Sequence, residues 1–146
     1  MIEINNRKAK FDYEIDSTIE TGIVLKGTEI KAIRLGNANL KDSYAIIKNN
    51  EVFLLGMHIS PYKEGNIFNH DELRTRKLLL HKKEILKLRD KLEIEGYTLV
   101  PIKLYFNKNK AKILLGVAKG KKSYDKRESI KKRDMMREMQ KNFKLR

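Results

Sequence analysis

Hydrophobic and polar residues alternate most regularly between residues 98 and 118. In the first half of this segment every second position belongs to one face, which comprises Thr98, Val100, Ile102, Leu104 and Phe106. The returning segment 111–118 keeps the same period with Ile113, Leu115 and Val117. A period of two is typical of strands with one buried face, and the polar run 107–110 predicts the turn between them. Pro101 predicts an edge or a bulge, because proline cannot donate to a sheet ladder.

Three further segments have the composition of strands. Residues 10–25 are rich in β-branched and aromatic residues, and we expect Gly22 to mark a kink or bulge there. The segments 44–48 and 52–55 flank Asn49-Asn50. Asparagine tolerates the positive φ angles of a tight turn, so this pattern predicts a β-hairpin.

Helical spacing occurs in two places. Residues 27–36 predict a short helix with Thr28 as N-cap, Ile30 and Ile33 on one side, and Gly36 as the left-handed residue that ends it. A second helix is predicted after His81, with Glu84 reaching back as in a capping box. Its apolar positions and its terminating glycine are Ile85, Leu88, Leu92 and Gly96. The segment 58–73 lacks periodicity and predicts a loop.

Many short strands and two helices within residues 1–118 predict a mainly β protein with helices. The fold class that fits best is a small closed antiparallel OB-like β-barrel with flanking α-helices, because such a barrel is small enough for side chains to fill. A basic C-terminal tail follows it. Periodicity does not determine the order of the strands.

Charge divides the chain unevenly. Residues 119–146 hold twelve Lys or Arg against four Asp or Glu, a net +8 of the formal +14 of the whole chain. So basic a segment, with few apolar residues, buries too little surface to order alone, and we expect it to become helical against a polyanion. The domains are therefore predicted as 1–118, a folded domain, and 119–146, a basic tail. A solvated tail that only aids solubility is the alternative.

Sequence features of an enzyme are lacking. There is no cysteine, the three histidines have no metal-ligand spacing, and no phosphate-binding glycine loop occurs. We therefore expect no catalytic residues, no metal and no cofactor. Asp71 and Glu72 are adjacent, but this pair is more typical of a turn than of a metal site. Carboxylates distant in sequence can converge after folding and bind two metal ions, so a two-metal nuclease is a minor alternative. No segment approaches the roughly 18 apolar residues of a membrane helix. We expect a soluble, cytoplasmic monomer without membrane contact.

Four basic clusters lie along the chain, and together they indicate a surface that contacts phosphates at several points. They are 6–8, Lys31 with Arg34, 74–77 and 119–122. Taken singly, each is as well explained as a solvated face. Aromatic side chains such as Phe11, Tyr13 and Tyr124 can stack on unpaired bases, although a place in the core is the commoner fate of strand aromatics such as Phe11 and Tyr13. Nucleic acid is the partner that this pattern favours.

An ordered set of motifs closely resembles the SsrA-binding protein family, also called small protein B. The matching stretches run along nearly the whole chain: Asn6-Arg7-Lys8-Ala9, Glu20-Thr21-Gly22-Ile23-Val24-Leu25, residues 27–34, Asp42-Ser43-Tyr44, His58-Ile59-Ser60-Pro61-Tyr62, Arg74-Thr75-Arg76-Lys77-Leu78-Leu79-Leu80, residues 96–101 and residues 118–127. A single stretch is weak evidence, whereas the ordered set is highly specific.

The resemblance implies an OB-like barrel and a role in trans-translation. Proteins of this family hold the tRNA-like end of transfer-messenger RNA (tmRNA, or SsrA) and deliver it to stalled ribosomes, and they catalyse nothing. Alanyl-tRNA synthetase and elongation factor Tu act on the same RNA. Carried over by motif, the implied RNA-binding residues are Asn6, Arg7, Lys8, Glu20, Lys31, Arg34, Arg76 and Lys77.

The resemblance also implies a ribosome-binding hinge into the tail, which enters the decoding region and the empty message channel. Its residues are Lys119, Gly120, Lys121, Lys122, Tyr124, Asp125, Lys126 and Arg127. Family members often carry His where this chain has Phe11 and Tyr124, a change that keeps stacking but removes protonation-dependent contacts.

Two questions stay open at this point. Glu20 can accept hydrogen bonds from base amino groups or from 2′-hydroxyls, or it can fix a neighbouring arginine. The alternative function is that of a general single-stranded nucleic-acid-binding OB-fold protein. It needs several aromatic residues on one exposed sheet face, and this chain has no Trp.

Overall fold

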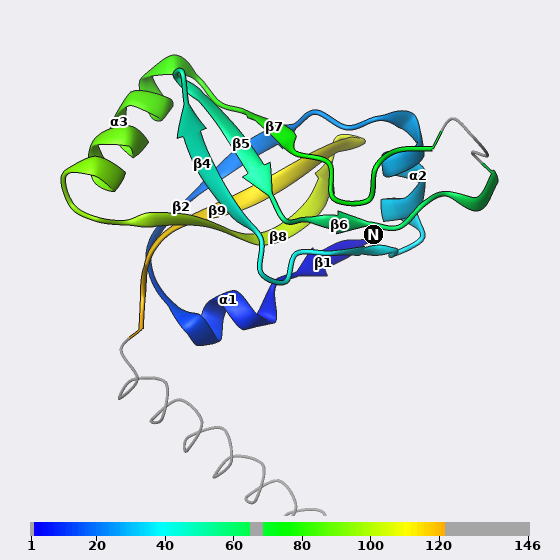
Figure 1. Ribbon diagram of the computed structural model, residues 1–146, viewed down its shortest axis with the longest axis horizontal. Helices are drawn as coiled ribbons and strands as arrows, with labels where there is room; N and C mark the ends of the chain where they lie inside the picture. The colour runs from blue at the N-terminus through cyan, green and yellow to red at the C-terminus, as the bar shows by residue number, and fades with distance from the viewer. Residues whose placement is uncertain (1, 65–68, 122–146) are drawn as a thin grey trace, which may run out of the picture.

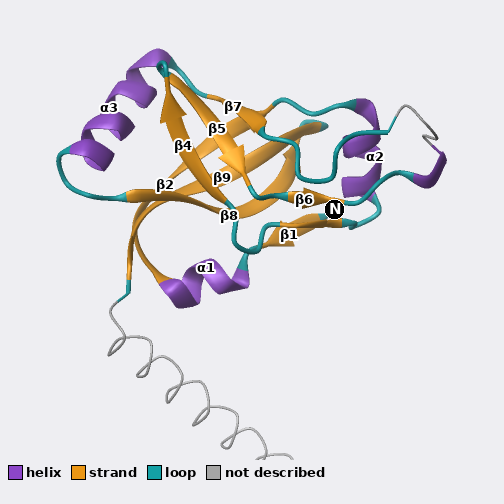
Figure 2. Ribbon diagram, in the orientation of Figure 1, coloured by secondary structure: helices purple, strands orange, loops and turns teal. Residues whose placement is uncertain are grey.

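The computed structural model describes residues 2–64 and 69–121. Within these residues the strands are β1 (Glu3–Asn5), β2 (Tyr13–Ile23), β3 (Ala38–Asn39), β4 (Tyr44–Lys48), β5 (Glu51–Leu55), β6 (His58–Ile59), β7 (Arg76–Leu79), β8 (Thr98–Asn107) and β9 (Lys110–Gly120). The helices are α1 (Arg7–Asp12), α2 (Gly27–Arg34) and α3 (Lys82–Glu93). Figure 2 shows that strands dominate, which confirms the predicted mainly β class with a few helices.

Seven of the strands form one antiparallel sheet in the order β1-β8-β4-β5-β7-β2-β9. An additional pairing joins β8 to β9, so the strands from β8 through β4, β5, β7, β2 and β9 return to β8. The short strands β3 and β6 pair separately. Figure 1 shows α3 at one end of the curved sheet and α2 at the other, with α1 below.

Both predicted hairpin turns are confirmed by their backbone angles. Asn49 and Asn50 have φ of 52° and 58° between β4 and β5. Lys108 and Asn109 have φ of 51° and 64° between β8 and β9. Two consecutive positive φ angles match the right-handed twist of the flanking strands, which explains why Asn occupies three of these four positions.

The bulges fall partly where the sequence predicted them. The register between β8 and β9 shifts between Pro101 and Lys103, as expected for a proline in a strand. The predicted bulge at Gly22 is not found, because Gly22 pairs in continuous register with Lys112, and the irregularity of β2 lies between Ile15 and Ser17. Glycine serves close packing at position 22, where an added Cβ would lie 3.2 Å from the Cβ of Leu79.

Sequence patterns missed the strands β1, β3 and β7, and they predicted a loop over 58–73 where β6 begins. They also missed helix α1, because residues 10–12 were predicted to continue the strand. Asn6 starts this helix: its side-chain Oδ1 accepts from the Ala9 N–H at 3.3 Å, and its Nδ2 donates to the carbonyls of Leu40 and Pro101. The helix buries Ala9 against Val100 and Ala118 in a small cluster of its own. Tertiary contacts therefore outweigh the strand propensity of this segment.

The ends of the other helices follow their predicted chemistry with one exception. Gly36 and Gly96 take φ of +80° and +74° just after α2 and α3. The N–H of His81 donates to Glu84 Oε1 at 3.0 Å, as predicted. Helix α2, however, begins at Gly27 with Lys26 as N-cap. Thr28 was predicted for that role, but its hydroxyl instead meets His70 Nδ1 at 2.9 Å.

The core fills the inside of the curved sheet. Its fully buried residues come from most strands and from α2, and they include Ile33, Leu54, Leu78, Leu99, Leu104, Ile113 and Leu115. Helix α3 adds Ile85 and Leu88 to the same cluster. Burial of such side chains contributes roughly 1.5–3 kcal/mol each.

A charged cluster is buried at the α2 end of the sheet. Glu29 of α2 and Arg76 of β7 both have 0 % exposure, and Arg76 Nε lies 2.6 Å from Glu29 Oε2. Arg74 Nη2 lies 2.6 Å from Glu29 Oε1. Burial alone would raise the pKa of Glu29, but hydrogen bonds from Arg74, the Lys26 backbone and Arg76 outweigh it, and the pKa is lowered.

This cluster generates the first prediction. Glu29→Gln should reduce the free energy of unfolding by about 3–5 kcal/mol, because it leaves the Arg76 charge buried without its partner. The measurement is urea unfolding at neutral pH. Since the pKa of Glu29 is lowered, its contribution is complete above about pH 4.3 and is lost as pH falls through the lowered pKa. The difference between the two proteins should therefore shrink in acid.

The matched control is Glu51→Gln, which removes an exposed carboxylate 3.5 Å from Lys77. That change should leave the stability nearly unchanged because surface pairs contribute little. Equal effects of the two substitutions would contradict the importance of the buried cluster.

Candidate nucleic-acid interface

The outer face of the sheet gathers charged, aromatic and apolar side chains. Thr21, Leu104 and Ile113 are buried on the inner face, so their neighbours along each strand lie outside. The register places Lys112 opposite both Gly22 and Tyr105, and Leu79 opposite Gly22. We call the resulting group the outer patch; it consists of Glu20, Leu79, Lys103, Tyr105 and Lys112.

Hydrogen bonding and charge organise the outer patch. The Tyr105 hydroxyl donates to Glu20 Oε2 at 2.5 Å. Burial and this carboxylate together raise the pKa of Tyr105 to about 12, so its phenol remains a donor at neutral pH. Lys103 Nζ lies 5.3 Å from the centre of the Tyr105 ring. Glu20 therefore fixes a tyrosine, a partner that was not among the predicted alternatives.

Helix α2 presents two predicted cations at its exposed surface. Lys31 Nζ lies 5.4 Å from the centre of the Tyr62 ring, and Arg34 Cζ lies 4.7 Å from that of Phe106. Cations over aromatic rings are attracted by the ring quadrupole. Both charges are thus held over aromatic rings while they remain exposed.

Helix α1 presents a second pair of cations, Arg7 and Lys8. Both are exposed, and Lys8 Nζ lies 2.6 Å from Asp42 Oδ1. The hydrogen bond with Asp42 raises the pKa of Lys8 above its ordinary value. Asn6, which precedes them, has only 6 % exposure, and its side chain caps α1 and bonds two backbone carbonyls. The structure thus gives Asn6 a structural role in place of the predicted RNA contact.

The basic cluster 74–77 is divided by the alternation of β7. Arg76 points inward, where its nitrogens donate to Glu29 and to the carbonyls of Met57, Asp71 and Glu72. A phosphate cannot reach this buried guanidinium, which corrects the predicted RNA contact of Arg76. Lys77 is exposed on the outer face, 3.5 Å from Glu51.

The predicted hinge begins inside the folded part of the chain. Strand β9 continues through Gly120, two residues past the predicted boundary at 118, and the Lys121 N–H donates to the Asp12 carbonyl at 2.9 Å. Lys119 Nζ lies 4.5 Å from the centre of the Tyr97 ring. The remaining hinge residues, Lys122, Tyr124, Asp125, Lys126 and Arg127, lie outside the described residues.

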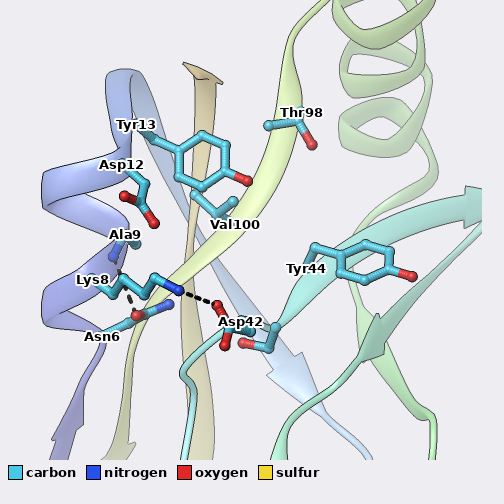
Figure 3. Close-up of a pocket in the computed structure, with 10 residues that line it drawn as sticks. Asn6, Lys8, Ala9, Asp12, Tyr13, Asp42, Tyr44, Thr98 and Val100 are labelled. Carbon is cyan, nitrogen blue, oxygen red and sulfur yellow. Dashed lines mark hydrogen bonds and ion pairs between the residues drawn. The ribbon is translucent and has the colours of Figure 1, made fainter. Parts of the chain in front are cut away.

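A cleft of about 210 Å³ separates α1 from the start of β4. Figure 3 shows Tyr13 on one side and Tyr44 on the other, with Val100 and Thr98 between them. The ion pair of Lys8 and Asp42 lies at its edge.

Sequence reasoning missed Leu79, Tyr105 and Lys112 of the outer patch. The alternation in 98–106 already placed Tyr105 on the polar face, so a signal existed for that residue. The convergence of Leu79 and Lys112 depends on the pairing of β7, β2 and β9, which periodicity does not provide. The exposed residues of the predicted set fall into three groups: Glu20 and Lys77 on the outer face, Lys31 and Arg34 on α2, and Arg7 and Lys8 on α1.

In residues 2–64 and 69–121 no three His, Cys, Asp or Glu side chains form a group that could hold a metal ion. None of the helices described here has the length and apolarity to cross a membrane.

Comparison with known proteins identifies the family. Residues 3–145 match the family model described as "SmpB protein". The chain belongs to the SmpB family. This confirms the family resemblance on which the predicted site residues depend.

Individual relatives agree with the SmpB assignment. The chain is 60% identical over 141 residues to the "SsrA-binding protein" of Staphylococcus aureus strain Newman, covering 97% of this chain and 92% of the relative. The "SsrA-binding protein" of strain USA300 / TCH1516 matches with the same values. A solved structure described as "tmRNA-SmpB: a journey to the center of the bacterial ribosome" superimposes with a TM-score of 0.72 at 46% identity, covering 89% of this chain and 95% of that one.

Proposed function

We propose that this protein binds the tRNA-like domain of transfer-messenger RNA and delivers it to stalled ribosomes in trans-translation. The observation that carries the proposal is the 60% identity to SsrA-binding proteins over 97% of the chain. The structural similarity to an SmpB chain described together with tmRNA and the ribosome supports it. The net charge of +14 suits both RNA partners.

The fold proposed for this function is an OB-like closed β-barrel. Its support is the ring of pairings that runs from β8 through β4, β5, β7 and β2 to β9 and back to β8. Closure of a sheet removes its exposed edges and holds the outer face in one shape. A fixed face suits folded RNA, which is recognised by shape, 2′-hydroxyls and unpaired bases.

The residues proposed to contact RNA are the exposed members of the predicted set. They are Arg7, Lys8, Glu20, Lys31, Arg34 and Lys77. Lysine and arginine neutralise phosphates and so position the RNA without reading its sequence. Asn6 and Arg76 support these positions through the backbone they hold.

The basic C-terminal segment is proposed to act on the ribosome. Lys119, Gly120, Lys121, Lys122, Tyr124, Asp125, Lys126 and Arg127 would form the hinge that directs the following residues to the decoding region and the message channel. The support is composition: a net +8 in residues 119–146 is attracted by ribosomal RNA phosphate. The protein itself would act in the cytoplasm as a monomer without catalysis, while alanyl-tRNA synthetase and elongation factor Tu act on the same RNA.

A competition assay tests the proposed function. The labelled tRNA-like RNA is bound to the full chain and challenged with unlabelled copies of itself or with single strands of equal length at matched salt. Only the folded RNA should compete efficiently, because shape is part of what is recognised. More efficient competition by single strands would sink the proposal and favour a general single-strand binder.

The charges on α2 generate a second test. Lys31→Ala with Arg34→Ala should weaken binding to the tRNA-like RNA and flatten the dependence of log K on log salt by roughly 0.7–0.9 for each phosphate that is no longer neutralised. The measurement is a salt series of binding isotherms. The matched control is Lys83→Ala with Lys87→Ala, two exposed lysines on α3 at the other end of the sheet (Figure 1). An unchanged slope in the α2 variant would show that its charges only face solvent.

A third prediction separates RNA binding from work on the ribosome. A chain that ends after Lys121 keeps all of β9 and the bond between Lys121 and Asp12. It should bind the tRNA-like RNA with nearly full affinity, because the proposed contacts precede it, but it should not support tagging of stalled peptides. Tagging in a reconstituted translation reaction is the measurement. Full tagging by the shortened chain would refute the proposed role of the tail.

A further inference from the structure

His70 is buried beside α2, with 6% of its surface exposed, and both of its ring nitrogens have partners. Its Nε2 lies 2.9 Å from the carbonyl oxygen of Ile59 in β6. Its Nδ1 lies 2.9 Å from the hydroxyl of Thr28, in the first turn of α2. One imidazole therefore bridges α2 to β6, a strand that the helix contacts.

The two partners assign the hydrogen of the His70 ring. A carbonyl oxygen can only accept, so Nε2 carries the hydrogen and donates to Ile59. Nδ1 then has a lone pair, and the Thr28 hydroxyl donates to it. Rotation of the ring would break both bonds, and buried polar groups that lose their partners are costly. His70 thus holds α2 and β6 in one relative position.

Asn69 makes a second connection directly before His70. Its Oδ1 accepts from the Tyr62 N–H at 2.9 Å, and its Nδ2 donates to the Tyr62 carbonyl at 2.5 Å. These two bonds hold the Tyr62 backbone in the way that a paired residue of a neighbouring strand would. A hydrogen bond with Glu64 raises the pKa of the Tyr62 hydroxyl, so that group already has a partner. What Tyr62 presents to α2 is the face of its ring.

The bond to His70 lies on the same face of α2 as Lys31. Thr28 and Lys31 are three residues apart, a spacing that places two side chains next to each other on a helix. Lys31 Nζ lies 5.4 Å from the centre of the Tyr62 ring. Both partners of this contact are therefore held from one point of the chain. His70 holds the helix that carries Lys31, and Asn69 holds the backbone of Tyr62.

Resting on the proposed function, we propose that His70 and Asn69 are positioning residues for RNA binding. They hold the Lys31 ammonium over Tyr62, at a fixed place where it meets a phosphate of the tRNA-like RNA. A lysine that is held in advance loses less conformational entropy on binding than one that is free. The buried Glu29 fixes the inner face of α2, whereas His70 fixes the face that carries Lys31.

The positioning is tested first in the protein without RNA. Thr28→Val removes the hydroxyl that meets His70 and keeps a branched side chain of nearly the same size. The side-chain protons of Lys31 should then lose the NMR ring-current shift caused by Tyr62, and the nitrogen shift of His70 Nδ1 should change because its donor is gone. Thr28→Ser keeps the hydroxyl and should keep both signals. Unchanged Lys31 shifts in Thr28→Val would overturn the positioning role.

RNA affinity shows whether this positioning serves binding. Thr28→Val should weaken binding of the full chain to the tRNA-like RNA by about 2- to 10-fold, the range expected when one more lysine has to be ordered on binding. In a Lys31→Ala background the same change should have almost no effect, because the charge that it positions is gone. In an Arg7→Ala background, which removes a cation of α1 instead, the loss should remain complete. A complete loss in the Lys31→Ala background would show that His70 only stabilises the fold.

Asn69→Ala tests the other connection at a half-buried residue. It should also remove the Lys31 ring-current shift, and its effect on RNA affinity should disappear in the Lys31→Ala background. An effect that persists there would count against Asn69 as a positioning residue. Failure of the wild-type protein to prefer the tRNA-like RNA would instead refute the proposed function, while the Lys31 shifts of the free protein would still decide whether His70 and Asn69 hold this side chain.

Discussion

The buried cluster of Glu29 with Arg74 and Arg76 fixes how α2 and β7 meet, in addition to the apolar contacts that both make with the core. Arg76 belongs to β7, Glu29 belongs to α2, and the same guanidinium binds the carbonyls of Met57, Asp71 and Glu72 from two separate loops. Removing two such charges from water costs several kcal/mol per ion, which only good geometry and further hydrogen bonds offset. A hydrophobic substitute could stabilise the chain equally well, so the cluster is better explained by the position it gives to α2.

That position determines where the charges of α2 lie. Once Glu29 is held inside, residues two and five positions later point away from the sheet, and these are Lys31 and Arg34. Arg34 then lies over Phe106 of β8, and Lys31 over Tyr62. Holding a cation over a ring reduces the conformational entropy lost when a phosphate is bound. The buried anion and the exposed cations are therefore two sides of one helix.

Much of this arrangement could be predicted from local sequence, and the remainder depends on strand pairing. The Asn49-Asn50 pair and the polar run 107–110 predict the two hairpins, and Glu84 with Gly96 predicts the limits of α3, because those signals act within a few residues. The roles of Arg76 and Asn6 could not be predicted. Pairing of β7 with β5 and β2 determines which side chains of β7 point into the core and which point outward. Arg76 is therefore buried and Lys77 exposed, although nothing in the local sequence of 74–77 distinguishes them. In α1 the decisive contacts are with Leu40 and Pro101, which are distant in sequence.

Because strand pairing decides which polar side chains are buried, the burial of each polar residue has to be known before a function is assigned to it. Arg76 and Lys77 are adjacent, yet the Arg76 side chain makes its hydrogen bonds inside the fold and the Lys77 side chain faces solvent. Glu29 and Glu20 likewise differ: the first holds buried guanidinium groups, and the second holds an exposed phenol. A protein with 33 basic residues attracts RNA through charge alone, which acts over long range and does not discriminate. Discrimination between RNAs therefore has to come from groups that the fold holds at fixed positions, and burial shows which polar groups are held inside and which are exposed.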